Sequence, residues 1–146
     1  MSFVQVTEIN WGLSSVPKFT PVMIRPEDVY LVSQHGRDRK EVALVFGVND
    51  EAFNRVIIQG ELHDVATAIG GLFRAELWRS SHGAPKLHVY LRESAIKAAF
   101  PLEPSYVRVV LRSGMMLVLE AADVPWFEDL SKAKCTAPKL LPSVDA

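Results

Sequence analysis

Two segments of the chain carry the same order of apolar strands and turns, and this internal similarity constrains the fold most. Residues 106 to 124 read YVRVVLRSGMMLVLEAADV, two apolar strands that fold back on each other at Ser113 and Gly114. Similar strands occur earlier, over residues 41–46 and 55–59. Repeated units of this kind bury their apolar faces against one another. The sequence therefore predicts a duplicated, strand-rich unit.

The similarity includes the residues before each hairpin. IRPEDVYLV (24–32) matches LRESAIKAA (91–99), which aligns Arg25 with Arg92 and Val29 with Ile96. EVALVF matches YVRVVL, and RVIIQ matches MLVLE; the aligned apolar residues are Val42 with Val107, Leu44 with Val109 and Phe46 with Leu111. The alternative interpretation is that any two apolar hairpins look alike.

Each half then continues towards a short helix. Leu62, Val65, Ala66 and Ile69 recur at helical spacing before Gly70 and Gly71, which are typical of a helix end. In the second half Pro125 suits a first helical turn, with the apolar face formed by Trp126, Phe127 and Leu130. We expect an α+β fold, an antiparallel sheet or sheets from two tandem β-β-β-α units packed together. The expected boundaries are an N-terminal strand and loop at 1–20, units at 21–71 and 87–130, a linker at 72–86 and a flexible tail at 131–146.

Composition narrows the class of protein. The 146 residues suit one compact domain or two very small ones sharing a core. Lys and Arg number 16 against 17 Asp and Glu, without the basic excess usual in a dedicated nucleic-acid protein. The single cysteine, Cys135, excludes an internal disulfide and a cysteine-based metal cage. Neither a signal peptide nor a long apolar run is visible, so we expect a soluble, cytoplasmic protein with no membrane contact.

Catalytic patterns are weak. His63 and Asp64 are adjacent in the expected helix, so their side chains diverge. Ser81 and His82 lie together in the linker, but a nucleophile also needs an orienting group placed by the fold. The four histidines lack the spacing of zinc ligands, and no phosphate-binding glycine loop surrounds Gly70. We therefore expect no enzyme activity, no cofactor and no metal.

Binding surfaces are better supported. In YVRVVLRS, one strand face carries Val107, Val109 and Leu111, and the opposite face carries Tyr106, Arg108, Val110 and Arg112. An aromatic ring with two guanidinium groups can stack on bases or pair with phosphates, although an ordinary solvated face has the same pattern. The linker adds Arg74 and Arg79 around Trp78. This tryptophan suits an interface, as do Trp11 and Trp126, or closes the core between the repeats.

FRAELWRSS (73–81), ESAI (93–96) and LRSGMMLVL (111–119) together resemble the LytTR DNA-binding domain family over residues 22–130. Phe73, Arg74, Arg79 and Ser80 match its signature, whereas Trp78 stands in place of the signature histidine. The hairpin and helix of each unit also resemble the short flagellar-regulator FlbD-type family. The LytTR resemblance implies sequence-specific binding of duplex DNA through Arg74, Arg79, Arg108 and Arg112.

The absence of a catalytic cluster, beside these candidate interface residues, predicts a non-enzymatic binding protein. We expect a small bacterial or phage-type regulator or adaptor that acts through protein–protein contact. The alternative is the LytTR-like DNA-binding transcriptional regulator. Edge strands in each unit would also allow a homodimer to form by sheet extension.

Overall fold

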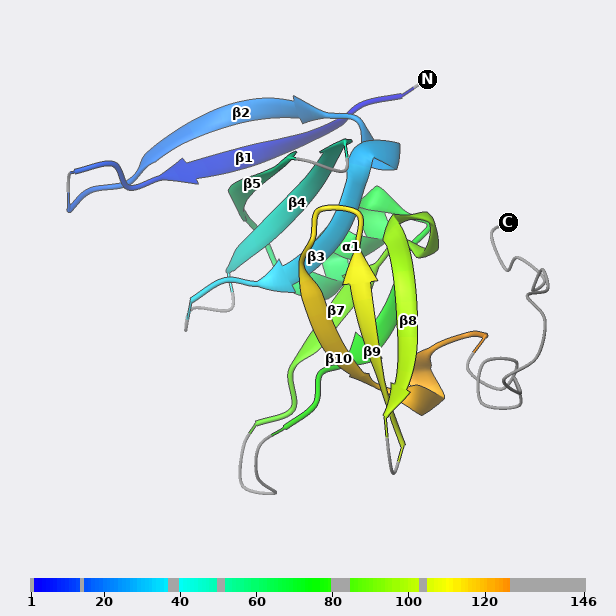
Figure 1. The fold of residues 1–146 in the computed structure, drawn as a ribbon. Helices are drawn as coiled ribbons and strands as arrows, with labels where there is room; N and C mark the ends of the chain where they lie inside the picture. The colour runs from blue at the N-terminus through cyan, green and yellow to red at the C-terminus, as the bar shows by residue number, and fades with distance from the viewer. Residues whose placement is uncertain are drawn as a thin grey trace.

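A computed structural model describes residues 2–13, 15–36, 40–49, 52–79, 85–102 and 105–126. These residues form antiparallel β-structure with one α-helix (Figure 1). The elements are β1 (Val4–Asn10), β2 (Lys18–Ile24), η1 (Pro26–Asp28), β3 (Val29–Gln34), β4 (Glu41–Asn49), β5 (Ala52–Gln59), α1 (Leu62–Ile69), β6 (Phe73–Glu76), β7 (His88–Leu91), η2 (Glu93–Ala95), β8 (Ile96–Leu102), β9 (Tyr106–Leu111), β10 (Met116–Glu120) and η3 (Ala121–Asp123). The η elements are single turns of 3-10 helix.

The strands form two sheets that are joined at one point. Seven strands follow the order β2-β1-β5-β4-β3-β7-β6, and three follow the order β10-β9-β8. Leu77, directly after β6, forms an isolated antiparallel bridge with Leu119 of β10, and the Trp78 amide donates to the Val118 carbonyl at 2.9 Å. The ten strands thus succeed one another from β2 to β8. Each of these two end strands has one neighbour among the described strands.

Strand register shows that the five strands β1–β5 are repeated by β6–β10. In the first hairpin Val4 lies opposite Ile24, and in the corresponding hairpin Phe73 lies opposite Leu91. The next contacts also correspond: Glu8 pairs with Ile58 as Leu77 pairs with Leu119. We call residues 4–60 module 1 and residues 73–121 module 2.

The repeat extends to local irregularities. β3 and β8 each follow a 3-10 turn, and each has a register shift after its first residue, between Val29 and Leu31 and between Ile96 and Ala98. The partners of Val29 and Ile96 are Phe46 and Leu111. The aligned pairs proposed from the sequence therefore lie at corresponding positions. A β-bulge repeated at one position is a specific feature, which excludes a chance likeness between two hairpins.

Two apolar cores lie in the fold, each built mostly from one module; Leu31 and Val45 also pack in the core of module 2, and Tyr90 packs in the core of module 1. In module 1 the fully buried side chains include Val42, Leu44 and Ile58 of the central strands, covered on one side by α1. In module 2 the corresponding residues are Val107, Val109 and Leu119. Burial alternates along β9, as expected for a strand with one face in a core.

The modules are joined through β3 of module 1 and β7 of module 2. Leu31, Val32 and Ser33 pair with Leu91, Tyr90 and Val89. Next to this ladder, the Arg92 guanidinium donates hydrogen bonds to the carbonyls of Val29 and Pro26, each at 2.9 Å, and of Gly70 at 3.2 Å. We call this pairing, with its arginine, the internal junction.

The expected α+β fold with two tandem β-β-β-α units is wrong. Module 1 is followed by a helix, but β10 is followed by the 3-10 turn η3, and Trp126 lies in a turn. The rest of the second expected helix, with Phe127 and Leu130, lies outside the described residues. Each unit has five strands because a further hairpin precedes the three that were expected. Proline at position 21 concealed β2, and β6 lies within the range expected to be a linker.

No described helix has the length and apolarity needed to cross a membrane. The expected tail, 131–146, lies outside the described residues.

Candidate functional site

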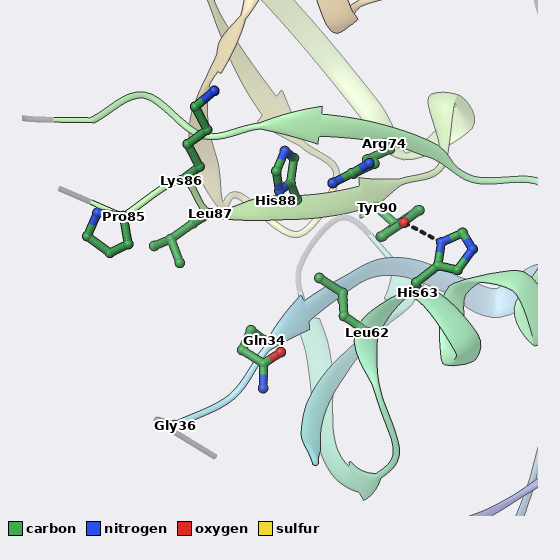
Figure 2. Close-up of a pocket in the computed structure, with 10 residues that line it drawn as sticks. All are labelled: Gln34, Gly36, Leu62, His63, Arg74, Pro85, Lys86, Leu87, His88 and Tyr90. Atoms are coloured by element: carbon green, nitrogen blue, oxygen red, sulfur yellow. Dashed lines mark hydrogen bonds between the residues drawn. The ribbon is translucent and has the colours of Figure 1, made fainter. Parts of the chain in front are cut away.

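A pocket of about 800 Å³ lies beside the internal junction, where α1, which follows module 1, meets β6 and β7 of module 2 (Figure 2). Its cationic and polar side chains come from both modules. The lining residues are Gln34, Gly36, Leu62, His63, Arg74, Pro85, Lys86, Leu87, His88 and Tyr90. The pocket therefore exists only because the two repeats are paired through β3 and β7.

Sheet geometry brings three of these side chains to one face. Arg74 of β6 lies directly opposite Tyr90 of β7. His88 is two residues before Tyr90 and so shares its face. Tyr90 is buried, and its hydroxyl forms a 2.9 Å hydrogen bond with Nδ1 of His63. This bond attaches the first turn of α1 to the second module.

The helix is positioned by its own amphipathic pattern. Val65, Ala66 and Ile69 are buried against module 1, which leaves His63 on the side towards β7. The chain then turns at Gly70 and Gly71, both with positive φ. A Cβ atom on Gly71 would lie 2.7 Å from Nη1 of Arg92. The Arg92 guanidinium therefore occupies the space that the side chain of any residue other than glycine would need at position 71.

The charged side chains among the described residues that line the pocket are cationic. Arg74, Lys86, His63 and His88 line it, and no described lining residue is a carboxylate. Arginine and lysine bind carboxylate and phosphate oxygens. The arrangement is thus suited to holding an anionic group, with the imidazoles as additional donors.

The predicted residues of the linker lie close to this pocket or just beyond it. Arg74 lines it. Trp78 has an exposed fraction of 51 %. Nε of Arg79 lies 3.7 Å from Oε1 of Glu76 in an ion pair on the same short segment. Only Arg74 of these three lines the pocket.

The predicted residues on β9 have other surroundings. Tyr106 and Arg108 of β9, and Arg112 directly after it, lie on the side away from the module 2 core, as the alternation predicted. The Arg108 guanidinium lies 5.0 Å from the centre of the Phe100 ring. Nε of Arg112 donates to the Ser94 carbonyl at 2.9 Å. These contacts belong to β8 and η2, whereas Arg74 belongs to the junction between the modules.

Sequence reasoning missed the partners of Arg74 in the pocket. The sequence patterns tested His63 only as a partner of Asp64 and as a zinc ligand, and His88 only as a zinc ligand. The available signal was the alignment itself: extending it upstream from residues 24 and 91 matches PVMI with HVYL and identifies β7 as a strand. Ser81, His82 and Cys135 lie outside the described residues. Within the described ranges no group of three or more metal-ligating side chains occurs.

A second surface is apolar. The β1–β2 hairpin projects from the rest of the molecule (Figure 1), and we call residues 2–24 the arm. Among the described large apolar side chains, more than half of the exposed ones lie on it; these are Phe3, Trp11, Leu13, Val16, Phe19 and Met23. Phe100 and Leu102 on β8 are also exposed.

Comparisons with known protein families, curated proteins and solved structures found no match for this chain.

Proposed function

We propose that the chain is a non-enzymatic binding protein that acts through protein–protein contact, with the arm as its main contact surface. The observation that supports this proposal is the number of exposed large apolar side chains on a projecting hairpin. Leu13 is fully exposed, and Phe19 and Met23 have exposed fractions of 53 % and 60 %. Several exposed large apolar side chains on one element are typical of an interaction surface.

The arm packs on the module 1 core through Ile24, Val6 and Val22, but little strand pairing joins it to the module, which supports this role. β1 pairs with β2 over seven positions but with β5 at one position, Glu8 with Ile58. A hairpin of two strands has marginal stability by itself. Retaining apolar residues on such an element suits contact with another protein better than it suits folding.

The test compares the wild-type chain with Phe19→Lys and Met116→Lys as baits in a lysate of the source cells. Met116 is as exposed as the arm residues, at 62 %, but lies on β10. We expect proteins retained by wild type and Met116→Lys to be lost with Phe19→Lys. Equal retention by all three baits would contradict the proposal. Circular dichroism of each bait checks that it is folded.

The second candidate function is binding of a phosphate-bearing ligand, of which duplex DNA is the form that the LytTR resemblance implies. The observation that favours it is the cationic pocket around Arg74 and Lys86. Duplex binding should weaken steeply with added salt and fall on Arg74→Ala, while Arg55→Ala, an exposed arginine of β5, should leave it unchanged. Affinity that is indifferent to salt and to both substitutions would remove this candidate.

A further inference from the structure

We propose that copies of this chain associate head to tail, with β8 of one copy pairing with β2 of the next as β3 pairs with β7 inside each chain. This inference names a partner for the proposed protein–protein contact and therefore rests on that function. The argument comes from the repeat. β8 is the counterpart of β3, and β2 is the counterpart of β7. The internal junction therefore shows how these two edges fit.

The counterpart residues define the register of the pairing. Inside the chain Leu31, Val32 and Ser33 pair with Leu91, Tyr90 and Val89. Translated through the repeat, Ala98 faces Ile24, Ala99 faces Met23 and Phe100 faces Val22 of the neighbouring copy. The segment that can pair is bounded by Pro101 and Pro21, which would face each other and which lack amide donors. Prolines at these positions fit strands at the edge of a sheet.

Side chains at equivalent positions of the two modules differ in exposure. The difference is the one expected if β2 and β8 lack the partner strand that β7 and β3 have. Tyr90 of the internal junction has an exposed fraction of 9 %, and its counterpart Met23 has 60 %. Ser33 is half-buried, whereas its counterpart Phe100 is exposed at 44 %. In the proposed pairing the small Ala99 lies opposite Met23, which gives the long side chain room to cover the module 2 core. Large apolar groups therefore stand exposed at the two edges that the repeat assigns to each other.

The arginine of the internal junction also has a counterpart. Arg92 donates to the carbonyls of Val29 and Pro26, and the equivalent residue is Arg25. Arg25 has a side chain that is 42 % exposed and an ion pair of 3.9 Å with Glu27. In the pairing between copies it would donate to the carbonyls of Ile96 and Glu93 of the neighbour. The same strand pairing and the same arginine hydrogen bonds would thus be used twice, once within the chain and once between copies.

The first test measures the mass of the purified full chain by sedimentation equilibrium, at concentrations up to about 500 µM because a short edge contact is a weak one. We expect the average mass to rise with concentration above the 16.2 kDa of one chain. Met23→Lys blocks the β2 edge and Phe100→Lys blocks the β8 edge, so each variant should remain monomeric. Met116→Lys should behave as wild type.

A mixture of the two blocked variants separates head-to-tail pairing from other arrangements. Met23→Lys keeps its β8 edge and Phe100→Lys keeps its β2 edge, so together they should form a dimer with one copy of each and grow no further. Arg25→Ala should weaken self-association of the chain about tenfold, the loss expected for hydrogen bonds from a charged donor, and Arg55→Ala should not. A mixture that stays monomeric, or one blocked variant that still associates alone, would overturn the proposal.

The register is tested by disulfide formation in a Cys135→Ser background. Phe100 and Val22 would form a non-hydrogen-bonded pair, in which Cα atoms lie about 4.5 Å apart, within the range that a disulfide bridges. Mixed Val22→Cys and Phe100→Cys chains should give a cross-linked dimer, and Val22→Cys mixed with Met116→Cys should not. A wild-type chain that stays monomeric at every concentration, yet retains lysate proteins through the arm, would refute this inference and leave the proposed function intact.

Discussion

Replacing Arg92 by alanine should destabilise the chain far more than the same change at its repeat counterpart, Arg25. The Arg92 side chain supplies three hydrogen bonds to main-chain carbonyls, two at 2.9 Å and one at 3.2 Å. Hydrogen bonds from a charged donor contribute about 1.5 to 3 kcal/mol each and do not add fully. We expect the free energy of unfolding to fall by about 3 to 5 kcal/mol for Arg92→Ala.

The comparison with Arg25 isolates the effect of position. Its side chain is 42 % exposed, forms an ion pair at 3.9 Å with Glu27 and lies 5.3 Å from the centre of the Phe3 ring, so Arg25→Ala should lower the free energy of unfolding by only about 1 kcal/mol. Urea unfolding at about 5 µM, below the concentrations at which weak edge contacts form, measures both. Arg92→Lys, which keeps the charge but has only one donor centre, should fall between them. Losses for Arg92→Ala and Arg25→Ala that are equal would refute the assignment of Arg92 as the clamp between the modules.

Three further changes test the cores and the junction by urea unfolding. Leu44→Ala empties a fully buried position of module 1 and should lower the free energy of unfolding by about 2 to 5 kcal/mol, while Met116→Ala at an exposed site should change it by less than about 0.5 kcal/mol; a small loss at Leu44 would contradict the core assignment. Tyr90→Phe removes the hydroxyl bonded to His63 and should cost about 1 kcal/mol, with no loss in a His63→Ala background if that bond is the cause. Gly71→Ala should cost more than about 1 kcal/mol, because φ is positive and the new methyl group meets the Arg92 guanidinium; a neutral result would remove the proposed close approach.

The strands that could be predicted are those whose signals are local. Residues 41–46 and 106–111 alternate or run apolar without a proline, and both are strands. β2 carries Pro21 in its middle, a residue that argues against a central strand. It is tolerated because the edge away from β1 has no described neighbour. The sequence pattern therefore failed at the place where an edge strand departs from the usual composition.

The site was less predictable than the strands because it depends on pairing between the modules. Arg74 was identified from its neighbours in the chain, but its pocket needs His63 from α1 and Lys86 and His88 from the segment leading into β7. These residues meet only when β3 pairs with β7. Within the described ranges, a helix of eight residues follows module 1, whereas a single 3-10 turn follows module 2.

Duplication of a five-stranded module produces two pairs of complementary sheet edges, and the chain joins only one of these pairs internally. Each module has one edge like β3 and one like β7. Joining two modules in one chain pairs one edge of each kind and leaves β8 and β2, which are complementary but lie at opposite ends of the strand order. An interface between unlike edges continues until the assembly closes as a ring or grows as a filament. If the contact between copies repeats the rotation of the internal junction, every module in such an assembly has equivalent neighbours, and the number of chains at closure follows from that single rotation.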